Sequence, residues 1–184
     1  MDERRFVLDC ALEAPWRWAA LQAVAALELP EAWIGAGFVR APVWDRLHGK
    51  TEATPLDDLD VIYFDSADLD PAREAALEAR LSATLPGHSW QVRNQARMHL
   101  RNGDRPYCSA ADALAHWLET PTAVALRLEA GQPHLLAPLG LDDLVSLRLC
   151  PTPHARRHRL AAYRERVAGK DWLARWPRIT VDWG

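Results

Sequence analysis

The chain has 184 residues, of which 49% are apolar and 26% charged, and this balance is typical of a folded globular protein. It excludes wholesale disorder and fibrous or collagen-like structure. The formal net charge of −3 produces no overall field toward nucleic acid or anionic lipid, although residues 150–184 are locally basic, with eight basic and three acidic side chains.

Targeting and redox features of the sequence indicate a cytoplasmic protein. No apolar run reaches the roughly 18 residues that a membrane helix needs, and the first residues carry no signal-peptide pattern. Cys10, Cys108 and Cys150 are far apart and odd in number, which fits free thiols in a reducing compartment. We expect a single domain over residues 1–184 that makes no membrane contact, with a basic helical segment over residues 152–176.

Helices and strands alternate along the predicted chain. A proline after a capping residue marks the start of two helices, at residues 70–71 and 152–153. The alternation favours an α/β (α+β) fold in which a mixed β-sheet is flanked by helices. In chain order the pattern predicts a helix over 15–29, a strand over 32–34, a helix over 38–47 kinked near Pro42, a strand over 59–64, a helix over 71–83, a strand over 88–100, a helix over 109–119, a hairpin of strands 122–129 and 134–137, a short helix over 140–149, and a final helix from 152 that ends at Gly169.

The most informative motif is a pair of aspartates at the entry to a predicted strand. Asp58 and Asp60 are two residues apart, so on a strand their side chains share one face, with roughly 6.6–7 Å between Cα atoms. The next four residues are apolar, so the strand continues into a core while the carboxylates stay at its edge. Such carboxylates are solvated, paired or bound to a cation, and Mg²⁺ binds through one or two carboxylates plus substrate phosphates. A solvated entry to the strand is the alternative.

The same Leu-Asp-Asp-Leu string occurs again at residues 141–144, where it follows Gly140 and precedes a helical segment. There Asp142 or Asp143 is most simply a helix cap or a first-turn acid. The tetrapeptide alone therefore indicates no function. The first copy differs because it has a third acid, Asp60, and an apolar strand behind it.

A second motif lies between the predicted strand over 32–34 and the helix after it. Gly35 and Gly37 allow the backbone to approach a phosphate, and the free N–H groups and dipole of a helix start favour an anion. Arg40, about one turn into the helix, is placed to reach the same anion. A tight turn without a ligand is the alternative. Together with the aspartate pair, the turn predicts a phosphate cradle beside a metal site.

Five segments of the chain carry a resemblance to a known family. They are WIGAGFVRxxVWDxLHG (33–49), LDDLDVIYFD (56–65), NQARMH (94–99), NGDxPY (102–107) and APLGLDDL (137–144). They resemble the bacterial nucleotidyltransferase-like proteins, a former family of unknown function in the polymerase-beta-type nucleotidyltransferase superfamily, over roughly residues 15–178. The resemblance implies the nucleotidyltransferase fold. It also implies that Gly35 and Gly37 hold a nucleoside triphosphate while Asp58 and Asp60 bind the metal ions.

Two features depart from the pattern of that superfamily. The stretch from Gly37 to Asp58 is longer than usual, which predicts an inserted loop beside the site. Active members carry a third carboxylate on a neighbouring strand, whereas the corresponding predicted strand here has no acid and places Asn94 near the expected position. An amide ligates a metal but does not act as a base at neutral pH, so Asp104, Glu119 or a substrate group would have to substitute.

Two further features allow both a functional and a structural interpretation. Trp44, one helical turn after Arg40, either stacks on a base or lies in the core. Arg97 shares a predicted strand face with Arg93 and His99, and that face either binds a substrate anion or is solvated or ion-paired.

The basic C-terminal segment also allows more than one interpretation. His154 and His158 are one helical turn apart and could clamp a metal, but no acidic or thiol ligand lies near them in sequence. The surrounding arginines either meet RNA or another polyanion, or form a solvated face over an apolar helical stripe.

The combined interpretation is a nucleotidyltransferase that uses Mg²⁺ or Mn²⁺ to transfer a nucleoside monophosphate from a nucleoside triphosphate to a small molecule, a protein hydroxyl or an RNA end. One alternative is an inactive module of the same fold that binds a nucleotide or a partner. Another is an RNA-binding protein that uses the basic C-terminal helix. The predicted site residues are Asp58 and Asp60 for catalysis and metal, Gly35, Gly37 and Arg40 for phosphate, and Trp44, Asn94 and Arg97 as possible substrate contacts.

Overall fold

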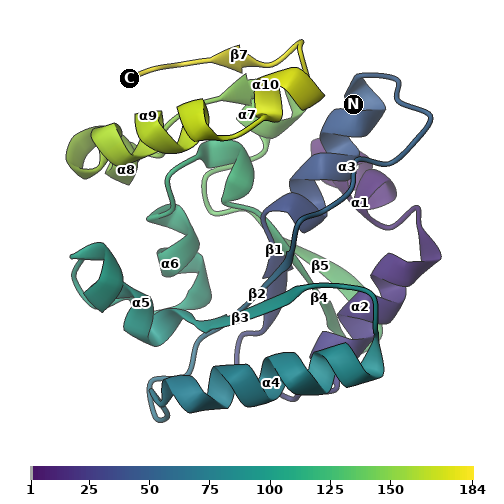
Figure 1. The fold of residues 1–184 in the computed structure, drawn as a ribbon, viewed down its shortest axis with the longest axis vertical. Coiled ribbons are helices and arrows are strands. Elements are labelled where there is room, and N and C mark those ends of the chain that lie inside the picture. The colour runs from purple at the N-terminus through teal and green to yellow at the C-terminus, as the bar shows by residue number, and fades with distance from the viewer. Residues whose placement is uncertain (1) are drawn as a thin grey trace.

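The computed structural model describes residues 2–184, and its centre is a five-stranded sheet in the order β3-β2-β1-β4-β5 (Figure 1). β2 and β3 are parallel, whereas the other neighbouring strands are antiparallel, so the sheet is mixed. Helices flank this sheet, which confirms the predicted fold class. The strands are β1 (Trp33–Gly35), β2 (Leu59–Tyr63), β3 (Trp90–Asn94), β4 (Ala125–Glu129) and β5 (Gln132–Leu136).

The remaining elements are mostly helical. In Figure 1, α4 runs below the sheet, α5 and α6 lie to one side, and the yellow C-terminal elements cross the top. Among the described residues, no helix has both the length and the apolar character needed to cross a membrane. The elements are α1 (Glu3–Ala11), α2 (Pro15–Ala25), α3 (Gly37–Leu47), α4 (Pro71–Thr84), α5 (Gln95–Asn102), α6 (Ala110–Ala115), the 3₁₀ turn η1 (Thr120–Thr122), α7 (Asp142–Val145), β6 (Arg148–Leu149), α8 (Pro153–His158), α9 (Leu160–Gly169), α10 (Trp172–Arg175) and β7 (Thr180–Val181).

The alternation of side chains along β2 determines which face carries the site. Leu59, Val61 and Tyr63 belong to the main core. Ile62 belongs to a smaller cluster on the other face, together with Leu114 of α6. Because strand side chains alternate between faces, Asp60 lies on the same face as Ile62, away from the main core.

Several local predictions are confirmed. Asp70 caps α4 by accepting a hydrogen bond from the backbone N–H of Ala72 at 2.9 Å, and Pro71 is the first residue of that helix. The two strands around Gly131 pair as an antiparallel hairpin. In both places the deciding interactions are local in sequence.

The predicted strand over 88–100 is wrong in its second half. β3 ends at Asn94, whose side chain accepts a hydrogen bond from the backbone N–H of Ala96 and so caps α5. The helix then ends at Gly103, which has the left-handed φ of +73°. Arg97 therefore lies on a helix, not on a strand face.

The C-terminal third also differs from the prediction. The helix expected over 140–149 is a single turn, α7, which ends before Leu147 at a φ of +55° and is followed by β6. The helix expected from 152 to Gly169 is interrupted at Arg159, whose φ and ψ of −138° and 30° separate α8 from α9. The pattern also missed α1, α10 and the β6–β7 pair.

Candidate active site

The turn from β1 into α3 joins the end of a sheet strand directly to a helix start. β1 ends at Gly35 and α3 begins at Gly37, with Ala36 between them. Ala36, not a glycine, takes the left-handed conformation, with a φ of 52° and a ψ of −122°. Such a conformation costs a side-chain-bearing residue about 1–3 kcal/mol, and strain of this kind is concentrated at binding sites.

The two aspartates lie next to this turn. Gln91 of β3 is in register with Asp60 of β2, and its amide Nε2 donates a hydrogen bond of 2.6 Å to Oδ2 of Asp58. Burial raises the pKa of Asp60 to about 6, and the charge of Asp58 adds to this, while Arg166 and Arg40 oppose it. The pair is thus an electrostatically unfavourable arrangement that a bound cation would relieve.

A cavity of about 280 Å³, here called the turn chamber, is lined by Gly37 and Arg40 of the first motif and by Asp58 and Asp60 of the second, but not by Gly35. It has four cationic side chains beside its three aspartates, so a phosphate group and a metal ion would both find partners in it. Trp172 and Trp176 contribute aromatic surface to it. The charged lining residues are Arg40, Arg166, Lys170, Arg175, Asp57, Asp58 and Asp60.

Arg40 is fixed in the wall of the turn chamber. Its Nη1 donates a hydrogen bond of 2.8 Å to Oγ1 of Thr122, and its guanidinium lies 4.5 Å from the ring centre of Trp172. Burial lowers its pKa to about 10, so the side chain remains charged at neutral pH. Its Nε is buried without a hydrogen-bond partner.

A second cavity of about 300 Å³, here called the sheet-face chamber, lies on the other side of the same residues. Both chambers are lined by Ala36, Asp60, Gln91 and Arg166. Beyond these shared residues, the sheet-face chamber extends along α5 and toward the break between α8 and α9. Its other charged or aromatic lining residues are Arg93, Arg101, Trp117, Glu119 and Arg159.

Glu119 is the one acid besides Asp60 among the described residues that line the sheet-face chamber. It is almost fully buried, with 1% of its surface exposed. Arg166 Nε lies 2.8 Å from its Oε1, in an ion pair whose angle is not that of a hydrogen bond, so Oε1 keeps unused acceptor capacity.

The residues present fit a hard divalent cation of the Mg²⁺ type. Within residues 2–184, no group of three or more His, Cys, Asp or Glu side chains is arranged to hold a metal by itself. Mg²⁺, however, is usually held by one or two carboxylates, with substrate phosphates completing its shell. Asp58 and Asp60 in a chamber rich in cations meet that requirement.

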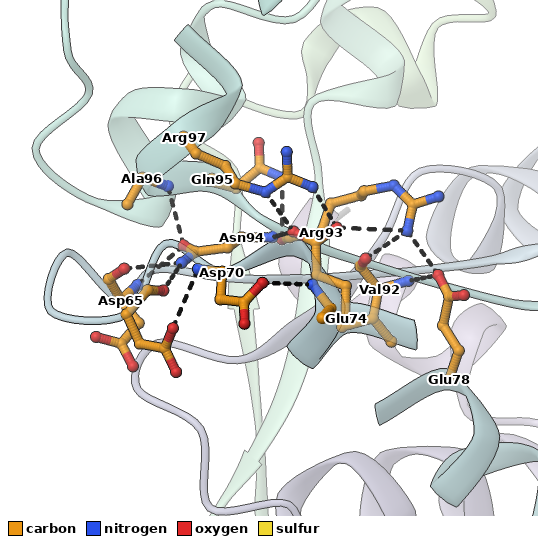
Figure 2. A network of polar contacts seen from close by, with 12 residues as sticks. Asp65, Asp70, Glu74, Glu78, Val92, Arg93, Asn94, Gln95, Ala96 and Arg97 are labelled. Carbon is orange, nitrogen blue, oxygen red and sulfur yellow. Dashed lines mark hydrogen bonds and ion pairs between the residues drawn. The ribbon is translucent and has the colours of Figure 1, made fainter. Parts of the chain in front are cut away.

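The position next to Asp60 on β3 is occupied by Gln91, not by Asn94. Asn94 is fully buried at the far end of the strand. Its amide donates hydrogen bonds to the backbone oxygens of Asp65 and Asp68, at 2.7 and 2.9 Å (Figure 2). The expectation that Asn94 stands near the third-carboxylate position is therefore corrected, because its side chain holds the loop before α4.

Arg97 and Trp44 also have structural partners. Arg97 Nε donates a hydrogen bond of 2.9 Å to Glu74 Oε1, and the two side chains form an ion pair within the network of Figure 2. Trp44 has no exposed surface, and its Nε1 donates to the backbone oxygen of Leu144 at 3.1 Å. The structure places both residues outside the two chambers, and a fully buried ring has no free face for a base.

Asp104 and the two histidines of α8 lie together away from both chambers. His154 Nε2 is 2.8 Å from Asp104 Oδ1, and the rings of His154 and His158 are 5.0 Å apart. Asp104 is therefore engaged with His154, and of the two acids that the sequence offered as substitutes only Glu119 lines a chamber with Asp60.

Sequence reasoning missed most of the cations of the site. Arg166, Lys170 and Arg175 come from the last 20 residues of the chain and meet Asp60 only through the fold. Their one signal was the local excess of basic residues after position 150, which did not indicate a target.

Comparison with known proteins gives two kinds of match. The profile of a family described as nucleotidyltransferase matches residues 22–181. A solved structure described as revealing a CCA-adding enzyme head domain is 32% identical, with a TM-score of 0.85 over 96% of this chain and 94% of that chain. No curated protein matches the chain.

More distant structures share the fold. Two apo forms described as a tRNA-processing enzyme have TM-scores of 0.55 and 0.52 at 16% and 17% identity. The chain covers 42% and 44% of their lengths, so it corresponds to less than half of those proteins.

Proposed function

This chain belongs to the nucleotidyltransferase family, and from that premise we propose that it transfers a nucleoside monophosphate from a nucleoside triphosphate to an acceptor hydroxyl, with Mg²⁺ or Mn²⁺ held by Asp58 and Asp60. The observation that carries the proposal is the turn chamber, where a helix start, paired carboxylates and four cationic side chains line one cavity. These groups are the partners that a metal–triphosphate complex requires.

The chain's own residues bind and orient the triphosphate. The free N–H groups at the start of α3 and the guanidinium of Arg40 receive phosphate oxygens, while Lys170 and Arg175 add positive charge. Gln91 holds Asp58 in place through its 2.6 Å hydrogen bond. A metal ion bound to the two aspartates would stabilise negative charge at the reacting phosphate oxygens.

Glu119 is the base in this proposal. The acceptor oxygen bonds to the α-phosphorus, the bond from that phosphorus to the bridging oxygen breaks, and pyrophosphate leaves with the electron pair. The proton of the acceptor hydroxyl passes to the carboxylate of Glu119, which lines the sheet-face chamber. Arg166 beside Glu119 balances charge before the transfer.

A thermal-shift panel of ATP, GTP, CTP and UTP, with and without Mg²⁺, tests the binding part. A nucleotide at 100 times its Kd stabilises the native state by about 2.7 kcal/mol, which is a Tm rise of about 5–10 °C for this length. The rise should require Mg²⁺ and disappear in Asp60→Ala. Asp142→Ala, in the second Leu-Asp-Asp-Leu string, is the control and should respond like the wild type. Absence of any Mg²⁺-dependent shift in the wild type would refute the proposal.

A pyrophosphate-release assay with candidate acceptors tests the chemical part. Glu119→Gln should keep the Mg²⁺-dependent shift but lose about 10²–10⁴-fold in rate, as removal of a general base does. Equal rates for Glu119→Gln and the wild type would reject the role of Glu119. The acceptor classes to assay are small molecules, protein hydroxyls and RNA ends. The likeness to a CCA-adding enzyme head domain supports including RNA ends.

Gln91 supports a second candidate function, a module that binds nucleotide without transferring it. An amide stands in register with Asp60, where a carboxylate would be needed if the third acid came from β3. This candidate predicts the same Mg²⁺-dependent shift but no pyrophosphate release with any acceptor, and Gln91→Glu would not create activity.

A further inference from the structure

The sheet-face chamber contains positive charge that its own acids do not neutralise. Four arginines line it, against two acids, Asp60 and Glu119. Arg93 is paired with Glu78 at 2.6 Å, and Arg166 with Glu119 at 2.8 Å. The two remaining arginines, Arg101 and Arg159, have no such acidic partner.

Neither of these two side chains has a hydrogen bond or an ion pair to any residue within 2–184. Arg101 stands in the last turn of α5, whereas Arg159 stands at the break between α8 and α9. Figure 1 shows α5 and the α8–α9 pair on the same side of the molecule. Two unpaired guanidinium groups that line one cavity from different elements are suited to bind an anion through several oxygens, as in phosphate recognition.

The rest of the chamber has an apolar component. Trp117 and Met98 are among its lining residues. Trp117 is partly exposed, unlike Trp44 in the core, so its ring can contact a ligand. A ring-bearing ligand with a phosphate group matches this combination of aromatic surface and paired arginines.

We propose that the sheet-face chamber binds a phosphate ester of the nucleotide type, with its phosphate on Arg101 and Arg159 and its ring against Trp117. If the chain is a nucleotidyltransferase as proposed above, this ligand is the acceptor, because Asp60 and Glu119 line the same chamber. The volume of about 300 Å³ accommodates one terminal nucleotide, which is either free or the end of an RNA strand.

Binding in the absence of nucleoside triphosphate and Mg²⁺ tests this inference independently of the transfer reaction. The probes are adenosine 5′-monophosphate, followed by calorimetry, and a 5′-fluorescein-labelled pentaadenylate with a free 3′ end, followed by polarisation. Arg101→Gln/Arg159→Gln should weaken binding about 100-fold, or about tenfold for each guanidinium group removed. Tighter binding of the pentaadenylate than of the monophosphate identifies an RNA end, and equal binding identifies a free nucleotide.

The matched control is Arg157→Gln/Arg164→Gln, which removes the same charge from exposed positions of α8 and α9 outside both chambers. It should bind both probes like the wild type. Lys170→Gln, which lies in the turn chamber alone, should weaken binding of Mg²⁺–ATP without changing that of either probe.

Three results would overturn the inference. They are the same loss in the control pair, no binding of either probe by the wild type at millimolar concentration, or loss of Mg²⁺–ATP binding in Arg101→Gln/Arg159→Gln. The third result would assign the chamber to the donor nucleotide. Failure of the proposed function appears separately, as absence of Mg²⁺–ATP binding in a wild type whose probe binding still depends on Arg101 and Arg159.

Discussion

At the scale of single residues, Asp60 lies in surroundings that disfavour its ionised form. It is largely withdrawn from water and stands two residues from Asp58 on the same strand entry, and burial together with that neighbour raises its pKa to about 6. A structural aspartate would be stabilised by its surroundings. The surroundings of Asp60 instead disfavour its ionised form, which is a property of sites that are completed by a ligand.

Replacement of Asp60 by asparagine should therefore stabilise the free protein. In the absence of divalent cations, Asp60→Asn should raise Tm by about 3 °C, which corresponds to about 1 kcal/mol for a chain of this length. The measurement is differential scanning calorimetry at pH 8 in a chelating buffer. Asp142→Asn, at the exposed position of the second Leu-Asp-Asp-Leu string, should leave Tm within about 1 °C. A fall in Tm for Asp60→Asn would mean that the carboxylate is structural.

The surroundings of Asp112, in contrast, favour its ionised form. Both of its oxygens accept hydrogen bonds of 2.9 Å from Arg105, and the backbone N–H of Cys108 donates a third at 3.0 Å. The hydrogen bonds from Arg105 are the largest cause of a pKa lowered to about 2. A lowered pKa means that the ionised form stabilises the folded state, so this contribution is present above the ordinary pKa of 3.8 and is lost as the pH falls through about 2.

The difference in unfolding free energy between the wild type and Asp112→Asn should follow that window. We expect the wild type to be more stable, by a constant amount above about pH 5 and by a shrinking amount from about pH 4 to about pH 2. Urea unfolding across this range provides the measurement. Asp9→Asn, which removes an exposed pair with Arg5, should change stability little at any pH. A difference that is undiminished at pH 2 would place the effect of Asp112 in packing rather than charge.

At the scale of elements, the turn from β1 into α3 separates two glycines with different roles. A Cβ at Gly35 would lie 3.2 Å from the backbone oxygen of Val124, which cannot move freely. A Cβ at Gly37 would meet the side chains of Leu56 at 3.5 Å and of Arg40 at 3.9 Å, both ordinary contact distances. Packing therefore accounts for Gly35 but not for Gly37, and under the proposed function the absence of a side chain at Gly37 would let a phosphate approach the helix start.

Gly37→Ala should therefore fold as well as the wild type and bind Mg²⁺–ATP about tenfold more weakly, since the added methyl stands where the backbone N–H groups meet the phosphate. Gly35→Ala should lower Tm instead. Thermal unfolding and calorimetric titration on the two variants separate these effects. Unchanged Mg²⁺–ATP binding by Gly37→Ala would remove the helix start from the phosphate site.

Some elements could be predicted from the sequence because their determinants are local. Asp70 and Pro71 start α4 by a cap and a fixed φ, and the alternation with a glycine turn specifies the β4–β5 hairpin. The prediction of a strand over 88–100 was wrong in its second half because the deciding interaction is not local. Residues 95–98 alternate in polarity and also suit one helical turn, and what decides between them is the side chain of Asn94, anchored to the distant loop at 65–68.

The residues of the candidate site also fall into those that a local motif predicts and those that only the fold brings together. Asp58, Asp60 and the glycine turn could be found because each is a short motif on one element. Gln91 could not, since only the register of β2 with β3 places it beside Asp60. The positive φ of Ala36 could not be predicted from residue type either. Glycine is the residue that usually adopts such a φ, and the sequence has a glycine on each side of Ala36.

At the scale of the whole molecule, the C-terminal segment completes the turn chamber. Trp172 and Trp176 pack against Trp44 of α3, with ring centres 6.4 and 5.1 Å away. This packing holds α10 against α3 and brings the locally basic end of the chain to the aspartates. Part of the charge excess after residue 150, which the sequence left as either an RNA-binding or a solvated face, therefore lines the candidate active site.

One buried carboxylate connects this segment to the loop beside the site. Asp45 accepts hydrogen bonds from Nε1 of Trp176 at 2.7 Å and from the backbone N–H and side-chain Oγ1 of Thr54 at 2.7 and 2.6 Å. Thr54 belongs to the predicted inserted loop that leads to Asp58. Asp45 therefore positions both the C-terminal segment and the loop before Asp58 in one arrangement.

Trp176→Phe should weaken this connection while keeping an aromatic ring in the core. Loss of the indole donor leaves a buried carboxylate with one partner fewer, at a cost of about 1–3 kcal/mol. Because Trp176 also lines the turn chamber, we expect Mg²⁺–ATP to bind about tenfold more weakly. Urea unfolding and calorimetric titration measure the two effects. Trp183→Phe changes a half-exposed ring near the end of the chain and is the matched control, expected to alter neither. A Trp176→Phe protein that is less stable but binds Mg²⁺–ATP normally would show that the C-terminal segment stabilises the fold without shaping the site.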